Sequence, residues 1–364
     1  MVAAASHRME MEMPALAPLV VSSVLCSAGL GMGVSLHAAG PHGVTLLFET
    51  EGPVAARVTA RAGKAEVAAQ DSAPATRHLL RLEKLAPDTE YAYEVAAGDA
   101  RAAGRFRTAP EDGKPQAFTF VVAGDARDHL AWAQVARAIQ EQHPRFLVVT
   151  GDSVRGGLGP DDWRDYYRAA QELFADVPVF SAMGNHDVSA DYDPYNPAPA
   201  GTSGTPRYYA FAWGNAAFVA LDSNHADDPA QLQWMKQALA PPPHGPLFVF
   251  QHHPLYSCGA HGSSAKLQAV WQPLFEQAHV TTDFAGHDHD LIAWAPVHGV
   301  RYVVSGGAGT VLYPLEGECQ GPFAKASYGF MSVTVDGEKV TQTFFDERGQ
   351  KLYAEPTFSA AAGR

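Results

Sequence analysis

The sequence predicts two domains, an N-terminal all-β domain followed by a larger domain in which strands and helices alternate. The chain has 364 residues, more than a typical single domain holds. Up to about residue 109, short strand-like runs are bounded by Gly, Pro and Asp, whereas from Phe118 apolar runs alternate with segments of helical spacing. Apolar residues make up 46% of the chain, which is enough for packed cores and argues against disorder.

The N-terminal domain is expected over residues 17–110, after a tail or remnant of a targeting segment at 1–16. Segment 19–25 is either its first strand or the apolar part of a signal peptide, and we favour the strand because two glutamates precede it. A polar linker with Pro and Gly is expected at 111–115. The strands expected in this domain are 44–48, 56–60, 91–95 and 106–110.

The second domain is expected over residues 116–353, followed by a tail at 354–364. Its apolar runs are continuous, as in strands that are buried on both faces. In such folds ligands bind at the carboxyl ends of the strands. The expected strands are 118–122, 146–149, 177–180, 217–221, 247–250 and 302–304, and the expected helices are 131–142, 161–174, 231–239 and 264–277.

Five short polar clusters follow these apolar runs: Gly124–Arg127, Gly151–Asp152, Gly184–Asp187, His252–Pro254 and Gly286–His289. Aspartate, asparagine and histidine are metal ligands, and two divalent ions roughly 3.5–4 Å apart need a bridging carboxylate. Asp152 is the natural bridge. His287 and His289 are spaced so that both rings lie on one side of an extended segment. The clusters therefore indicate a hydrolytic centre with two metal ions.

These motifs, in this order, resemble the calcineurin-like metallophosphoesterase superfamily. The likeness is strongest to a bacterial, purple-acid-phosphatase-like branch with an N-terminal fibronectin type III-like domain, whose tyrosine-corner pattern segment 85–93 resembles. The resemblance implies an all-β sandwich followed by an αββα metallophosphoesterase sandwich. It implies a first metal held by Asp125, Asp152 and His289, and a second held by Asp152, Asn185, His252 and His287.

The resemblance also implies roles for residues that do not bind metal. His186 would stabilise the transition state or protonate the leaving alkoxide, with Asp187 orienting its ring. His261 lies where purple acid phosphatases carry a histidine that contacts substrate. Asn185 would contact substrate as well as metal.

Two positions depart from the family pattern. Arg155 stands where purple acid phosphatases have a tyrosine ligand, so the purple iron–tyrosinate colour should be absent. Arg127 stands where many relatives have a metal-binding histidine, which leaves the first metal three recognisable ligands unless Asp128 or His129 completes the set. We interpret both arginines as partners of a phosphate group.

The predicted function is hydrolysis of phosphoric esters, most simply of phosphomonoesters, by a hydroxide activated at two metal ions. The ions would be divalent or of mixed valence, and iron, manganese and zinc all suit these ligands. A phosphodiesterase is the first alternative. A module that binds phosphate or a protein without catalysis is the second, motivated by the arginines at positions 127 and 155.

Charge and cysteine content bear on partners and compartment. The formal net charge of −13 disfavours nucleic acid, so a small phosphorylated substrate is expected. No membrane span is expected. Cys258 and Cys319 would form a disulfide in an oxidising compartment or remain buried thiols. A periplasmic or extracellular location is suspected, and the sequence indicates no oligomeric state.

Overall fold

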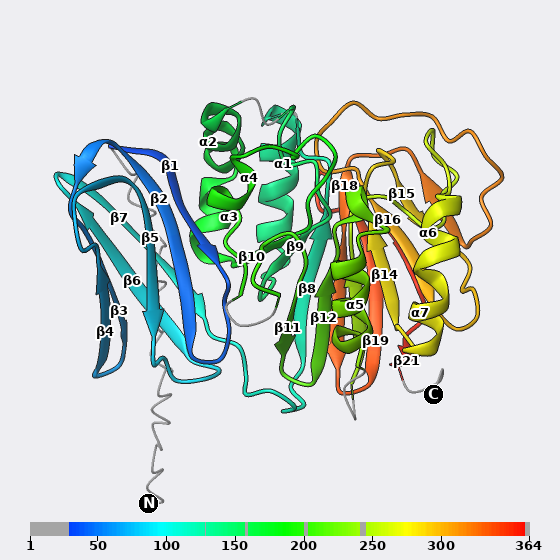
Figure 1. Cartoon of the computed structure of the whole chain (residues 1–364), viewed down its shortest axis with the longest axis horizontal. Coiled ribbons are helices and arrows are strands. Elements are labelled where there is room, and N and C mark those ends of the chain that lie inside the picture. Colours follow the sequence, from blue (N-terminus) through cyan, green and yellow to red (C-terminus); the bar gives the residue numbers. More distant parts are fainter. Residues whose placement is uncertain (1–28, 128, 157–158, 200–202, 241–244, 361–364) are drawn as a thin grey trace, which may run out of the picture.

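The computed structural model describes residues 29–127, 129–156, 159–199, 203–240 and 245–360, and their strands form three sheets (Figure 1). The largest sheet has ten strands. In spatial order they are β20 (Lys351–Ala354), β19 (Lys339–Asp346), β18 (Gly329–Asp336), β8 (Phe118–Ala123), β9 (Leu147–Val149), β10 (Val179–Ser181), β1 (Leu30–His37), β2 (Gly43–Val54) and β5 (Ala75–Glu83), with β21 (Phe358–Ser359) paired to β19.

The other two sheets are smaller. The seven-stranded sheet runs in the order β11 (Tyr209–Trp213), β12 (Ala216–Ala220), β13 (Leu247–Phe250), β14 (Thr282–Ala285), β16 (Arg301–Ser305), β15 (Leu291–Ala293) and β17 (Phe323–Lys325). The four-stranded sheet runs in the order β4 (Ala65–Gln70), β3 (Ala56–Ala62), β6 (Glu90–Ala97) and β7 (Ala100–Arg107).

Helices cover the outer faces of the two large sheets. Two of the expected helices are each divided in the structure. Segment 161–174 is interrupted at Ala170, which leaves helical geometry, and segment 264–277 is interrupted before Pro273, whose ring disfavours a continuous helix. The helices are α1 (His129–Gln140), α2 (Pro160–Ala169), α3 (Gln171–Asp176), α4 (Tyr192–Tyr195), η1 (Ser223–His225), α5 (Pro229–Ala238), α6 (Ala265–Val270) and α7 (Gln272–Gln277).

Successive side chains of a strand face opposite sides of the sheet, and each side is covered by a different layer. In β8, Phe120 packs between the sheets, with its ring centroid 5.1 Å from Phe218 and 5.3 Å from Phe248. The alternate residue Val121 faces the core beneath α1 and α2. A matching outer core lies beneath α5, α6 and α7 on the second sheet. This αββα arrangement agrees with the sequence prediction.

Strands β1 to β7 form a β-rich unit at one end of the molecule, called here the N-terminal unit (Figure 1). Tyr91 bears out the tyrosine-corner pattern, because its hydroxyl accepts a hydrogen bond from the backbone N–H of Ala86 at 2.9 Å. The assignment of this unit to the fibronectin type III class stays a prediction. The expected first strand at 19–25 lies outside the described residues, and the first described strand is β1.

The N-terminal unit shares a sheet with the rest of the chain. β1 pairs in parallel with β10 through His37 and Val179, so β1, β2 and β5 extend the large central sheet. The segment expected as a C-terminal tail also joins this sheet, because β21 pairs with β19.

A disulfide links Cys258 to Cys319 across 61 residues, which decides between the two alternatives for these cysteines. Cys26 lies outside the described residues. None of the helices in the described part of the chain is long and apolar enough to cross a membrane.

Candidate metal centre

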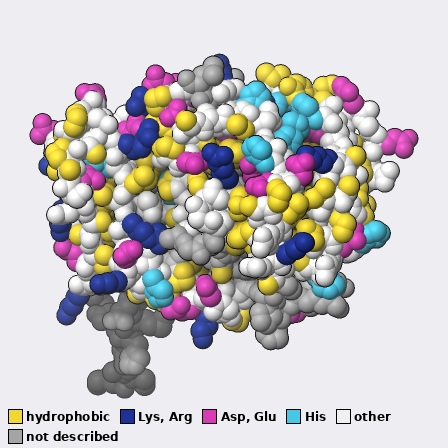
Figure 2. All heavy atoms as spheres, in the orientation of Figure 1, with side chains coloured by type: hydrophobic (Ala, Val, Ile, Leu, Met, Phe, Trp, Pro, Cys, Tyr) yellow, Lys and Arg dark blue, Asp and Glu magenta, His cyan; other side chains and the backbone are white. Residues whose placement is uncertain are grey.

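The five polar clusters meet at one edge of the two central sheets. Asp125, Asp152 and Asn185 lie beyond the ends of β8, β9 and β10, which run in parallel, while His252 and His287 lie beyond the parallel strands β13 and β14. Figure 2 shows histidine side chains gathered with basic and acidic ones at the upper edge of the molecule. The carboxyl ends of both sheets therefore build a single site.

Three of the clustered residues have left-handed backbone conformations that non-glycine residues seldom adopt. The φ angles of Asp125, Asp152 and His287 are +63°, +54° and +70°. Hydrogen bonds hold these turns: the Asp125 N–H donates to the carbonyl of Gly151 at 2.9 Å, and the His287 N–H donates to Asp125 Oδ2 at 2.9 Å. Such conformations concentrate at functional sites, where the surrounding structure enforces them.

The glycines of the clusters are required because the backbone there lies very close to the carboxylates. A Cβ atom on Gly184 would lie 2.2 Å from Asp152 Oδ1, and one on Gly286 would lie 2.4 Å from Asp125 Oδ2. The pattern of glycine beside a polar residue in the sequence therefore marks where the backbone packs directly against a candidate ligand.

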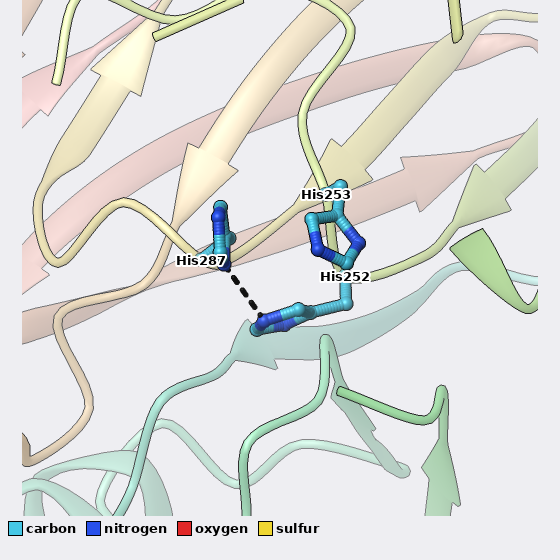
Figure 3. A group of neighbouring side chains, drawn as sticks. All are labelled: His252, His253 and His287. Atoms are coloured by element: carbon cyan, nitrogen blue, oxygen red, sulfur yellow. Dashed lines mark hydrogen bonds between the residues drawn. The ribbon is translucent and has the colours of Figure 1, made fainter. Parts of the chain in front are cut away.

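The second predicted ligand set converges. His252 donates from Nδ1 to the carbonyl of Thr150 at 2.9 Å, and burial lowers the pKa of this imidazole well below its ordinary value, so Nε2 presents a lone pair. Around Nε2 lie Asn185 Oδ1 at 2.9 Å and Asp152 Oδ1 at 3.4 Å. His287 Nδ1 lies 3.1 Å from the same nitrogen, as the dashed line in Figure 3 marks. Several acceptor atoms facing one another fit a bound cation.

The first predicted ligand set is also assembled, but an arginine lies within it. His289 donates from Nδ1 to the carbonyl of Val311 at 2.7 Å, and its Nε2 accepts from Arg127 Nη2 at 2.6 Å. Arg127 Nε lies 3.6 Å from Asp152 Oδ2, and His289 Nε2 lies 3.6 Å from Asp125 Oδ1. The guanidinium therefore lies against His289 and Asp152, two of the three expected ligands, and this set does not fit a metal ion as it stands.

The two carboxylates of the centre depend on nearby positive charge. Burial raises the pKa of Asp125 well above its ordinary value and also raises that of Asp152, while the charge of Arg127 acts in the opposite direction on both. Asp125 Oδ1 is buried without a hydrogen-bond partner among the described residues. Two buried carboxylates close to each other favour the binding of cations at this site.

The expectation that Asp187 orients the ring of His186 is wrong. Asp187 accepts hydrogen bonds from the backbone N–H groups of Asp152, Ser153, Val154 and Gly184 at 2.8–3.3 Å. His186 instead donates from Nδ1 to the carbonyl of Arg155 at 2.6 Å. Asp187 is buried below the site, so it fixes the turn that carries Asp152.

The remaining predicted residues lie around the two sets. The ring of His261 lies 4.2 Å from that of His287, centroid to centroid, and its Nδ1 is 3.0 Å from the buried Asp288 carboxylate. Arg155 is exposed and donates from Nε to the carbonyl of Arg127 at 3.1 Å. Asp128 and the side chain of His129 lie outside the described part of the chain.

Sequence reasoning missed several supporting groups. Tyr313 stacks on His289 with centroids 4.3 Å apart, and the carbonyls of Thr150 and Val311 select the imidazole nitrogens that face the centre. Backbone carbonyls leave no residue-type signal in a sequence.

Comparison with known proteins gives one family match and several distant relatives. Residues 118–291 match the family described as calcineurin-like phosphoesterase. Purple acid phosphatase 1 of Ipomoea batatas is 25% identical over 251 residues, covering 62% of this chain and 53% of the relative. A protein of Rhodopseudomonas palustris described as a probable cyclic nucleotide phosphodiesterase is 29% identical over 249 residues, covering 62% of this chain and 85% of the relative.

Solved structures share the fold. The purple acid phosphatase from yellow lupin (Lupinus luteus) seeds superposes with a TM-score of 0.76 at 15% identity, covering 92% of this chain and 74% of the other. The structure of PhoD gives a TM-score of 0.66 at 13% identity, covering 93% and 90%. By contrast, the chain spans about half the length of the curated plant phosphatase it matches, with 53% covered.

Proposed function

We propose that this chain is a metal-dependent hydrolase of phosphoric esters, because residues 118–291 match the calcineurin-like phosphoesterase family. The observation that carries the proposal is the convergence of Asn185 Oδ1, His287 Nδ1 and Asp152 Oδ1 within 3.4 Å of His252 Nε2. Zinc, manganese and iron all suit this mixture of nitrogen and oxygen donors. Such a cation supplies Lewis acidity toward a phosphoryl oxygen and toward water.

The residues around the second ligand set support defined roles in this reaction. His186 is held at Nδ1 by the Arg155 carbonyl, so in its imidazolium form Nε2 is the atom that can deliver a proton to the leaving alkoxide. Asp288 holds His261 through Nδ1, so in its imidazolium form His261 can donate from Nε2 to a phosphate oxygen. Arg155, at the exposed rim, adds a cation that can pair with a phosphate oxygen.

Phosphomonoesters are the proposed substrate class. A monoester dianion carries more charge than a diester, and Arg127, Arg155 and His261 offer several donors around one small site. Phosphodiesters are the second candidate, favoured by the relative described as a cyclic nucleotide phosphodiesterase. The disulfide between Cys258 and Cys319 supports an oxidising compartment such as the periplasm or the cell exterior.

Hydrolysis of paired chromogenic esters tests the proposal. Para-nitrophenyl phosphate and bis-para-nitrophenyl phosphate would be offered to protein that has been stripped with a chelator and reloaded with zinc, manganese or iron. We expect the monoester to be cleaved faster. Faster cleavage of the diester would favour the second candidate. Absence of hydrolysis of either ester by metal-loaded protein would instead favour the non-catalytic binding module.

A further inference from the structure

We propose that the guanidinium of Arg127 takes the place of the first metal ion, so that the centre binds one divalent cation per chain. The inference rests on the proposed function in one respect, because it takes the second ligand set as the metal site. In the first ligand set, by contrast, His289 and Asp152 hold a side-chain cation of the protein itself, whose charge also acts on Asp125.

The geometry of the first set excludes simultaneous occupation by metal and arginine. Arg127 Nη2 lies 2.6 Å from His289 Nε2, and the other nitrogen of that ring is committed to the Val311 carbonyl. A metal ligated by the same Nε2 would lie about 2.0–2.1 Å from it. The guanidinium would therefore have to leave before a metal could bind.

Arg127 is largely buried, and hydrogen bonds fix the backbone around it. Its side chain is only 13% exposed. The preceding N–H, of Ala126, donates to the Asp152 carbonyl at 3.0 Å, and the Arg127 carbonyl accepts from Arg155 Nε at 3.1 Å. An arginine keeps its charge at all ordinary pH values, so it cannot turn into a neutral ligand. Its withdrawal would leave buried carboxylates without a counter-charge.

Asp152 divides its two oxygens between the two sets. Oδ2 faces Arg127 Nε at 3.6 Å, whereas Oδ1 faces His252 Nε2 at 3.4 Å and accepts from the His186 N–H at 2.9 Å. A carboxylate placed to bridge two cations is thus shared between a guanidinium and the second ligand set. Because a guanidinium only donates hydrogen bonds, the first position can hold a phosphate oxygen but cannot ligate water.

Metal stoichiometry tests the inference without relying on activity. Stripped wild-type protein would be reloaded with Mn²⁺, freed of loosely bound ion and measured by elemental analysis, with the electron paramagnetic resonance spectrum recorded in parallel. The informative variant is Arg127→His, which supplies a ligand in place of the cation. The matched control is Arg137→His, which adds a histidine at an exposed position of α1.

We expect one metal per chain with the spectrum of isolated Mn²⁺ in the wild type and in Arg137→His. Arg127→His should bind two and show spin coupling between them. Should Arg127→His fail to fold, Arg127→Lys keeps the positive charge and should bind one. Two spin-coupled ions in the wild type would overturn the inference while leaving the proposed function intact. No bound metal in the wild type would overturn both.

Discussion

At the scale of single residues, Asp152 connects every part of the centre. Its backbone is held in a left-handed turn by Asp187, and Gly184 lies against its carboxylate with no room for a Cβ atom. Its two oxygens face different sets of candidate ligands. A change confined to the charge of this side chain should therefore affect metal binding more than the fold.

Asp152→Asn should strip the metal and reduce hydrolysis to a small residual rate. The amide keeps the shape of the carboxyl group but removes the negative charge, and the loss of metal-supported catalysis should lower kcat/KM by roughly 10³-fold, or ~4 kcal/mol. Elemental analysis and para-nitrophenyl phosphate hydrolysis measure the two effects. The matched control is Asp161→Asn, at a side chain that is 88% exposed on α2. Near-full activity of Asp152→Asn would disprove the role assigned to Asp152.

The sequence predicted which residues gather at the centre better than it predicted where their side chains point. The order of the clusters and their glycines was sufficient to bring Asp125, Asn185 and His287 together. It did not reveal that Arg127 turns inward to His289, or that Asp187 binds backbone N–H groups. Those directions depend on carbonyls and on chain segments that are distant in sequence.

At the scale of elements, the strands buried between the layers were predictable from continuous apolar runs, as in β8 and β13. The antiparallel pair β18 and β19, which borders β8, was missed because its pairing is set by tertiary contacts rather than by local composition. Divided helices escaped prediction for a similar reason: the residues on both sides of Ala170 have helical spacing, and only the backbone shows the break.

Strand β14 carries a buried carboxyl group that should make stability depend on pH. Burial raises the pKa of Asp283 to about 8, although Gln251 donates to its Oδ2 at 3.0 Å. In the unfolded chain the pKa is about 3.9. Between those values the unfolded chain loses a proton that the folded chain keeps. The free energy of unfolding should therefore fall with rising pH, by up to about 1.4 kcal/mol per pH unit.

Asp283→Asn should remove this dependence, because the amide stays neutral. Urea unfolding between about pH 5 and pH 8 would give the free energy of unfolding of both proteins. We expect the variant to gain stability relative to the wild type as the pH rises. Asp336→Asn, at an exposed position of β18, is the control. A constant difference between Asp283→Asn and the wild type across this range would refute the assignment.

In the molecule as a whole, the N-terminal unit and the αββα layers are joined by more than a linker. Besides the pairing of β1 with β10, the Tyr93 hydroxyl donates to the Ala175 carbonyl at 2.8 Å, and the Arg105 N–H donates to Asp176 Oδ1 at 3.0 Å. Both acceptors lie at the end of α3, which packs against β1 and β7. The polar linker predicted at 111–115 did not indicate this interface.

The two parts should consequently unfold together. Scanning calorimetry should show one transition whose calorimetric and van't Hoff enthalpies agree. Tyr93→Phe, which deletes one hydrogen bond across the interface, should lower the midpoint and keep a single transition, at a cost of about 1 kcal/mol. Two separate transitions in the wild type would show that the units are independent.

Hydrolysis of phosphoric esters is expected to require a cation at the second ligand set. Chelator-stripped protein would be titrated with metal, and bound metal and para-nitrophenyl phosphate hydrolysis would be measured in the same samples. The variant Asn185→Ala, which deletes one ligand atom of that set, would be titrated in the same way. We expect no hydrolysis by stripped protein, activity proportional to bound metal, and loss of both in the variant. Full activity in stripped protein, or metal-loaded protein without activity, would contradict it.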